Sequence, residues 1–245
     1  MKKYYQAQNL SQFPNLVHAF STKHYGNLSW QAAKDPSKWL ETTQAQAALA
    51  VDLKFDPEDL ISAYQKHTKK VAVINEDSMP IFLADGLVTH QRLTPLMVHT
   101  ADCMPVLLYD PKKQVIGAVH AGWRGTLAGI GPAAVFAMQT KFESRPSDII
   151  VAVGPSIGPC HFEVKDDVWL PFKRQFRDGQ IFNRRGSGKY LNLWLALSET
   201  LQQAGVPPKN IEIMGICTYC QASDFSSYRR DKNYSVAMGN IIYTK

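Results

Sequence analysis

The chain has 245 residues, 45% of them hydrophobic, and a formal net charge of +6. Neither a linker nor a repeat divides it, so we expect one domain over residues 1–245. It shows neither an apolar signal region nor a run long enough to span a bilayer, which predicts a cytoplasmic protein without a membrane partner. The excess of lysine and arginine is spread along the chain. It is weak evidence for nucleic acid and fits a small anionic substrate equally well.

Short apolar runs separated by polar turns predict strands and helices in mixed order. The predicted strands are residues 16–20, 71–74, 86–89, 95–99, 104–109, 115–120, 148–153 and 211–216. The predicted helices are residues 36–50, 126–142, 165–176 and 190–204. Thr126 is the expected N-cap of the second helix, whose first turn is expected to be irregular because the helix interior holds Gly129, Gly131 and Pro132. An exposed loop is expected at 186–188. This order predicts an α/β (α+β) fold.

Two near-continuous apolar runs joined by Asp110-Pro-Lys-Lys113 predict a β-hairpin covered on both faces. A four-residue loop pairs Tyr109 with Gln114 and sets Cys103 opposite His120. Residues in such a pair have β-carbons roughly 4.5–5.5 Å apart, close enough to share a metal ion. A five-residue loop would instead turn the two side chains to opposite faces.

Cys103 and His120 suggest a catalytic zinc site, which has three protein ligands and one open position. His67, just before the apolar run 71–74, is a good candidate for the third ligand. The competing candidates are His90, His99, Asp102 and His161. The pattern alone is equally consistent with a buried core thiol at Cys103 and a core histidine at His120.

Two other segments carry cysteine. Cys217-Thr-Tyr-Cys220 lacks a second C-x-x-C pair and the helix that follows a thioredoxin-type motif, so we expect a structural or incidental role. Cys160 and His161 end a loop rich in glycine and proline. That loop either lines a site or simply makes a tight connection after strand 148–153, and the sequence leaves both open.

Three cationic residues are candidates for contact with an anion. Arg124 lies near a predicted helix N-terminus, where backbone amides and the helix dipole favour phosphate or carboxylate. Its alternative role is a surface salt bridge. Arg229 and Lys23 would add positive charge. The aromatic residues that could stack on a flat base, or else belong to the core, are Trp123, Phe225 and Tyr228.

These residues together resemble the YfiH-like or laccase-domain family (DUF152), also called peptidoglycan editing factors or multicopper polyphenol oxidases, whose members act as purine nucleoside phosphorylases. The similarity runs over nearly the whole chain. It is carried by His18-Ala-Phe-Ser-Thr22, Gln65-Lys-His67, Ala84-Asp-Gly-Leu-Val-Thr89, Thr100-Ala-Asp-Cys-Met-Pro-Val-Leu108, Val119-His-Ala-Gly-Trp-Arg-Gly-Thr126, Gly154-Pro-Ser-Ile-Gly-Pro-Cys160, Cys217-Thr218 and Phe225-Ser-Ser-Tyr-Arg-Arg-Asp231.

The resemblance implies a layered fold of mixed β-sheets flanked by helices, similar to the catalytic domain of a cysteine-dependent deamidase toxin. It also implies a zinc ion bound by His67, Cys103 and His120, and so selects His67 among the candidates. The implied reactions are phosphorolysis of adenosine, inosine, guanosine and methylthioadenosine to the base and ribose 1-phosphate, together with adenosine deamination.

Roles for further residues follow from the implied chemistry. Zinc lowers the pKa of bound water to about 7, and the hydroxide could attack C6 of adenine. Asp102, beside a ligand, is expected to move the proton or else to serve as a structural hydrogen-bond acceptor. Phosphorolysis requires cations around phosphate, for which Arg124 is the leading candidate, with Lys23 and Arg229 as further substrate contacts.

The chain departs from the family at three places. Lys23 stands where arginine is usual, which keeps the charge but loses the bidentate geometry. Thr68 replaces the glycine after the first ligand, and Ser235-Val236 replaces a usual Gly-Arg. We expect these changes to weaken or shift the nucleoside preference and to leave the three ligands intact.

Three other functions compete with this reading. A multicopper laccase needs about ten histidines, mostly in His-x-His pairs. This chain has seven histidines and no such pair, so copper is expected only as an adventitious occupant of the zinc site. A cysteine hydrolase or amidase acting in peptidoglycan precursor editing would use Cys103 as nucleophile and His120 as base, and would tolerate the loss of His67. A non-catalytic protein would bind nucleosides without turnover.

Overall fold

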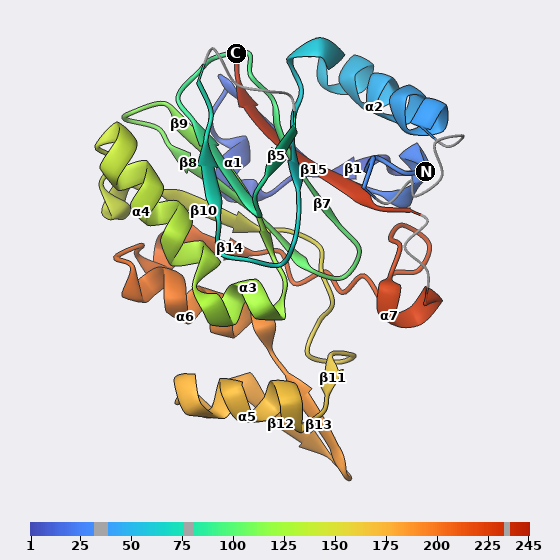
Figure 1. The fold of residues 1–245 in the computed structure, drawn as a ribbon, viewed down its shortest axis with the longest axis vertical. Coiled ribbons are helices and arrows are strands. Elements are labelled where there is room, and N and C mark those ends of the chain that lie inside the picture. Colours follow the sequence, from blue (N-terminus) through green and yellow to red (C-terminus); the bar gives the residue numbers. More distant parts are fainter. Residues whose placement is uncertain (32–38, 76–80, 233–235) are drawn as a thin grey trace.

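The computed structural model describes residues 1–31, 39–75, 81–232 and 236–245, and two six-stranded sheets form its centre (Figure 1). The first sheet has the order β1 (Tyr4–Tyr5), β2 (Leu16–Ser21), β15 (Met238–Thr244), β7 (Leu96–Thr100), β3 (Ile61–Tyr64) and β5 (Ile81–Leu83). The second sheet has the order β14 (Ile211–Ile213), β10 (Ile150–Val153), β8 (Met104–Asp110), β9 (Val115–Ala121), β6 (Gly86–Thr89) and β4 (Val71–Val73). Both sheets contain parallel and antiparallel pairs, as the mixed order of elements predicts.

A third, small sheet has the order β11 (Glu163–Val164), β13 (Gly188–Leu191) and β12 (Phe182–Arg185). The helices are α1 (Gln8–Ser11), α2 (Trp39–Leu53), α3 (Trp123–Ala128), α4 (Ile130–Phe142), α5 (Asp166–Gln175), α6 (Leu193–Gln203) and α7 (Tyr228–Asp231). Figure 1 shows the small sheet and α5 together at one end of the molecule. Among the described residues, no helix is both long and apolar enough to cross a membrane.

Three apolar clusters bind the layers together. Residues such as Leu107 and Ile116 of the second sheet and Leu96 of the first form the core between the two sheets. Because side chains alternate along a strand, the neighbouring residues of β8 and β9 face the other way, toward α4 and α6. On the far side of the first sheet, Met97 packs in one cluster with Leu49 of α2. The layers are therefore helix, sheet, sheet, helix, and the predicted fold class is confirmed.

The predicted helix over 126–142 is wrong in one respect: two helices occupy the region. Gly129 has a φ of +85°, and its N–H bonds to the carbonyls of Gly125 and Thr126, so it ends α3 just before α4 begins. Thr126 lies inside α3, whose N-cap is Gly122. Pro132 is the third residue of α4, in the first turn, where no N–H is required.

The remaining predicted elements match with shifted ends. The strand at 86–89 agrees with β6, and 165–176 contains α5. The helix predicted at 190–204 contains α6, but its first two residues belong to β13. The strand predicted at 148–153 begins only at Ile150, after a 3₁₀ turn, and the one at 211–216 stops at Ile213. Residues 36–38 of the first predicted helix lie outside the described residues. The strands not predicted are β1, β3, β5, β11, β12, β13 and β15, and the expected loop at 186–188 is the turn between β12 and β13.

The hairpin β8–β9 forms with both faces buried, but its predicted register is wrong. Asp110 pairs with Val115, so the loop is residues 111–114, and His120 lies opposite Pro105 rather than Cys103. The Asp110 carboxylate accepts the N–H groups of the two following lysines, 2.9 and 3.2 Å away, which fixes the start of the turn one residue later than expected. Cys103 therefore lies beyond the strand, in the bend before β8.

Candidate metal centre

The centre forms where two chain segments cross from the first sheet to the second. The loop after β3 carries His67 to β4, and the loop after β7 carries Cys103 to β8. Because β3 and β7 are parallel neighbours, both loops leave the first sheet at the same edge. His120, near the end of β9, lies beside the start of β8. Topology thus brings three residues that are distant in sequence to one point.

The ligand atoms of His67, Cys103 and His120 all lie within 4.8 Å of one another. The Sγ of Cys103 is 3.8 Å from Nε2 of His67. The two imidazole rings meet nearly at right angles, 82°, with their centroids 4.7 Å apart. A tetrahedral zinc ion with bonds of about 2.3 Å to sulfur and 2.0–2.1 Å to nitrogen would separate two such ligand atoms by about 3.6 Å. The spacing fits one metal ion.

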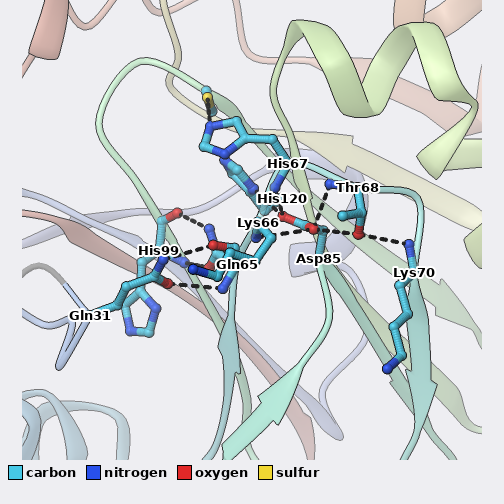
Figure 2. A network of polar contacts seen from close by, with 10 residues as sticks. Gln31, Gln65, Lys66, His67, Thr68, Lys70, Asp85, His99 and His120 are labelled. Carbon is cyan, nitrogen blue, oxygen red and sulfur yellow. Dashed lines mark hydrogen bonds and ion pairs between the residues drawn. The ribbon is translucent and has the colours of Figure 1, made fainter.

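Asp85 organises the centre from behind (Figure 2). Its buried carboxylate lies 2.9 Å from Nδ1 of His120 and accepts the backbone N–H of His67, also at 2.9 Å. It also accepts the N–H and the hydroxyl of Thr68, both at 2.7 Å. Burial opposes ionisation, but the hydrogen bonds from His120 and Thr68 hold the pKa of this carboxyl well below its usual range. With Nδ1 engaged, His120 presents Nε2 to the other two ligands.

Asp85 is the residue of the candidate centre that the sequence pattern did not single out. It lies within Ala84-Asp-Gly-Leu-Val-Thr89, directly before a strand whose four residues are all buried. A carboxylate at such a place needs hydrogen-bond donors, and that signal could have identified it. The departure at Thr68 also gains a role, because its hydroxyl supplies one of these donors.

Charge is concentrated on Cys103 and His120. Burial alone would raise the pKa of the Cys103 thiol, but the charge and hydrogen bond of His120 lower it to about 6. Burial likewise works against protonation of His120, yet Cys103 and Asp85 raise its pKa to about 9. Thiolate is the form of cysteine that binds a metal or attacks a carbon atom, so the pair suits either chemistry.

A Gly122→Ala variant tests how tightly the centre is built. A β-carbon there would lie 2.9 Å from Cδ2 of His67 and 3.0 Å from Sγ of Cys103. We expect metal affinity to fall about 10- to 100-fold, as when groups supporting a ligand are disturbed. Competition with a chelator measures it. Gly179→Ala is the control, because a β-carbon at Gly179 meets nothing within 4 Å. Equal metal retention by both variants would contradict this geometry.

Two cavities meet at the centre. The amide cavity, of about 280 Å³, is lined by Ser29, Gln31, Gln65, His67, His99, Thr100, Ala101, Cys103, His120 and Ala237. The arginine cavity, of about 680 Å³, includes in its lining Asp102, Trp123, Arg124, Tyr228, Arg229 and Lys232. His67 and Cys103 line both, so an ion held by them would be reached from either side.

The lining of the amide cavity is fixed by paired amides, as Figure 2 shows. The side chain of Gln65 bonds both backbone groups of His99 at 2.7 Å, and that of Gln31 does the same for Gln65 at 2.7 and 2.9 Å. Burial lowers the pKa of His99 to about 4, although the nearby backbone of Leu28 raises it by a smaller amount. Neither ring nitrogen of His99 has a hydrogen-bond partner of ordinary geometry among the described residues. This neutral imidazole suits a polar ligand in the cavity.

The arginine cavity offers positive charge. The exposed guanidinium of Arg124, at the start of α3, lies 4.2 Å from the centroid of the Trp123 ring. Arg229 donates to the carbonyls of Glu163 and His161, at 2.7 and 3.3 Å, which fixes one arm of its fork. The other charged groups in the lining are Asp102, Glu163, Lys165, Asp167 and Lys232.

Asp102 lines the arginine cavity, and its carboxylate already accepts hydrogen bonds from other residues of the protein. It accepts the hydroxyls of Thr218 and Ser227, at 2.7 and 3.0 Å, and the backbone N–H of Arg229 at 2.7 Å. Its φ is +89°, outside the usual range for a residue with a side chain. These bonds match the structural alternative, and a part in proton transfer stays a prediction.

Other predicted residues lie elsewhere. Lys23 donates its ammonium to the carbonyl of Ala222 at 2.6 Å and is not among the described residues that line the two cavities. His90 is exposed and packs near Phe142. Of the three aromatic residues considered, Trp123 and Tyr228 line the arginine cavity, while Phe225 is fully buried. Ser235 lies outside the described residues.

Comparison with known proteins agrees with the fold and the resemblance. Residues 17–245 match the family described as multi-copper polyphenol oxidoreductase laccase. A purine nucleoside phosphorylase of Bacteroides thetaiotaomicron is 30% identical, with 91% of this chain and 89% of that protein covered. Adenosine deaminase RL5, from an unidentified prokaryote, is 34% identical over 78% of this chain and 77% of its own length. The crystal structure of Bacillus licheniformis hypothetical protein YfiH covers all of this chain and 97% of its own, with 27% identity and a TM-score of 0.91.

Proposed function

The chain belongs to the multi-copper polyphenol oxidoreductase laccase family, and from that membership we propose that it is a zinc-dependent purine nucleoside enzyme. It would cleave adenosine, inosine, guanosine and methylthioadenosine with phosphate, releasing the base and ribose 1-phosphate, and would also deaminate adenosine. The relatives named purine nucleoside phosphorylase and adenosine deaminase support this reading. The observation that carries it is the convergence of His67, Cys103 and His120 at the boundary of two cavities of different chemistry.

The donor set favours zinc at this centre. Two imidazoles and one thiolate form the three-ligand set that leaves zinc one open position. When bound, zinc would lower the pKa of a bound water to about 7 or polarise an oxygen of the substrate. The multicopper site of the family description needs about ten histidines, mostly in His-x-His pairs, whereas this chain has seven and no such pair. By the affinity order of divalent metals, a single copper ion could still occupy the site adventitiously.

The chain's own residues would place the two substrates on either side of the centre. The amide cavity would hold the nucleoside, with the neutral ring of His99 as a hydrogen-bond partner for a polar group. The arginine cavity would hold phosphate, with the guanidinium of Arg124 matched to its oxygens. The ribose of the nucleoside would then lie at the boundary between the two cavities, close to the bound phosphate.

Product analysis tests the proposal directly. Purified protein, with its metal content measured by elemental analysis, is incubated with adenosine and phosphate, and the products are separated by chromatography. Adenine indicates phosphorolysis, inosine indicates deamination, and hypoxanthine indicates both. Absence of every product after a long incubation, with nucleoside still bound, would leave a non-catalytic binding protein.

A second function is favoured by the geometry of Cys103 and His120, whose sulfur and ring nitrogen lie within 4.8 Å of each other. The charge and hydrogen bond of His120 lower the pKa of this thiol to about 6. The pair could serve as nucleophile and base of a cysteine hydrolase or amidase without a metal, for example on peptidoglycan precursors. That function does not require His67 as a ligand, so loss of His67 separates the two.

An Arg124→Ala variant tests where phosphate binds. Hydrogen bonds to a charged group contribute about 1.5–3 kcal/mol, so we expect the KM for phosphate to rise about 10- to 100-fold. The rate of adenine release at several phosphate concentrations measures it. Arg174→Ala, at an exposed arginine of α5 outside the lining of both cavities, is the matched control. An unchanged KM for phosphate in Arg124→Ala would remove Arg124 from this role.

A further inference from the structure

A second group of metal-binding side chains lies apart from the three-ligand centre. It consists of Cys160 and His161, in the loop after β10, and Cys217 and Cys220, in the loop after β14. Strands β10 and β14 are parallel neighbours, so both loops leave the second sheet at the same edge. A further bridge between Ser156 and Cys217 continues the contact beyond the strands.

The four ligand atoms have the spacing of a tetrahedral zinc site. All of them lie within 4.8 Å of one another. The sulfurs of Cys160 and Cys220 are 3.6 Å apart, and the Cys220 sulfur is 3.3 Å from Nδ1 of His161. Zinc bonds of about 2.3 Å to sulfur and 2.0–2.1 Å to nitrogen would give separations of about 3.8 Å for two sulfurs and 3.6 Å for sulfur and nitrogen. An ion would need only small movements of these side chains.

Neighbouring groups support this geometry. The backbone N–H of Gly158 donates to the Cys217 sulfur at 3.2 Å, the kind of bond that orients a thiolate ligand. The ring of Tyr219 stacks on His161 with centroids 4.0 Å apart and planes 15° apart, which holds the imidazole in place. A β-carbon on Gly158 would lie 3.2 Å from the Cys160 sulfur, so the loop approaches the cluster closely.

We infer that Cys160, His161, Cys217 and Cys220 bind one structural zinc ion. Three thiolates and one imidazole complete a four-coordinate set, the arrangement of zinc sites that hold a fold together rather than react. Soft sulfur ligands select zinc over hard cations such as magnesium or calcium. This inference does not depend on the proposed enzymatic function.

The ion would act on the wall of the arginine cavity. In the first loop, Ile157 donates its N–H to the carbonyl of Asp102 at 2.9 Å. In the second, the hydroxyl of Thr218 donates to the Asp102 carboxylate at 2.7 Å. The guanidinium of Arg229 reaches the carbonyl of His161 at 3.3 Å. A metal joining the two loops would therefore fix the surroundings of Asp102 and Arg229 without touching a substrate.

Metal stoichiometry tests the inference. Metal-free protein, kept reduced, is titrated with Zn²⁺, and we expect two ions per chain, one for each cluster. Cys220→Ser, at an exposed position, and His161→Gln should each bind one. Cys103→Ser removes the only cysteine outside the second cluster and should also bind one, while the double variant Cys103→Ser/Cys220→Ser should bind none.

Co²⁺ then reports the ligands. In the Cys103→Ser background it should give the intense absorption of tetrahedral cobalt with thiolate ligands, and this absorption should vanish when Cys220→Ser is added. One ion per chain in both wild type and Cys220→Ser would overturn the inference. So would a disulfide between Cys160 and Cys220, found by peptide mapping in protein isolated under reducing conditions. Because the readout is metal binding alone, failure of the proposed nucleoside activity would leave this result unaffected.

Discussion

Replacing His67 with alanine is expected to remove the metal ion from the three-ligand centre and to reduce adenosine turnover about a thousandfold. Lewis-acid stabilisation by a metal contributes several kcal/mol to a transition state. Each 1.4 kcal/mol is about a factor of ten in rate. His67 supplies a nitrogen 3.8 Å from the Cys103 sulfur, and without it only two ligands remain. Elemental analysis and the rate of product release measure the two effects together.

The structure offers a control for His67→Ala and defines the result that would contradict its prediction. His90→Ala removes an exposed histidine of the same chain, which lies outside both metal-binding clusters, and should leave metal content and rate close to wild type. If His67→Ala loses the metal but keeps its activity, and that activity disappears in Cys103→Ser, the cysteine hydrolase replaces the zinc enzyme. The same variant therefore decides between the two catalytic hypotheses.

Replacing Asp85 with alanine is expected to lower the free energy of unfolding by about 3–5 kcal/mol, the usual cost of breaking a buried ion pair. The carboxylate is fully buried, and the loss would leave His120 and three backbone N–H groups without their acceptor. We also expect metal affinity to fall about 10- to 100-fold, because Asp85 orients the ring of His120 without binding the metal itself. Urea unfolding and chelator competition measure the two quantities.

Asp110→Ala separates stability from metal binding. Asp110 is equally buried and also accepts two backbone N–H groups, but it does so in the β8–β9 turn, away from the centre. We expect this variant to be destabilised while its metal affinity stays close to wild type. Wild-type metal affinity in Asp85→Ala would show that Asp85 supports the fold and does not tune the centre.

The strands and helices are predicted from local sequence patterns, and these predictions agree with the structure where a short stretch alone shows how an element is buried. The apolar runs of β6, β8 and β9 identify buried strands because the whole strand is covered on both faces. The short strand β3, Ile-Ser-Ala-Tyr, lacks such a run, and its pairing with β5 comes from contacts formed only in the folded chain. The break between α3 and α4 depends on one glycine with positive φ, which sequence spacing does not reveal.

Counting residues back from the predicted β8–β9 loop puts Cys103 near His120, but by a cross-strand pairing that does not occur, since His120 lies opposite Pro105. The two residues meet because the chain bends before β8 and turns the thiol back over the end of β9. The third ligand, His67, was selected by resemblance, because its neighbourhood depends on a crossover between two sheets that no local pattern encodes.

The grouping of Cys160, His161, Cys217 and Cys220 depends even more on the tertiary structure. The sequence presents Cys160-His161 and Cys217-Thr-Tyr-Cys220 as two unrelated segments, each with an unremarkable alternative. Only the parallel pairing of β10 with β14 brings them together.

The amino-acid order by itself determined the chemical identity of the donors, the family resemblance and most of the buried strands, since side-chain chemistry and hydrophobic alternation are properties of short stretches. The tertiary structure alone decided which donors lie close enough to share an ion, that Asp85 contacts His120, and that Cys103 lines two cavities. Those outcomes depend on how the sheets are stacked and where loops cross between them, and such long-range contacts arise from packing of the whole chain.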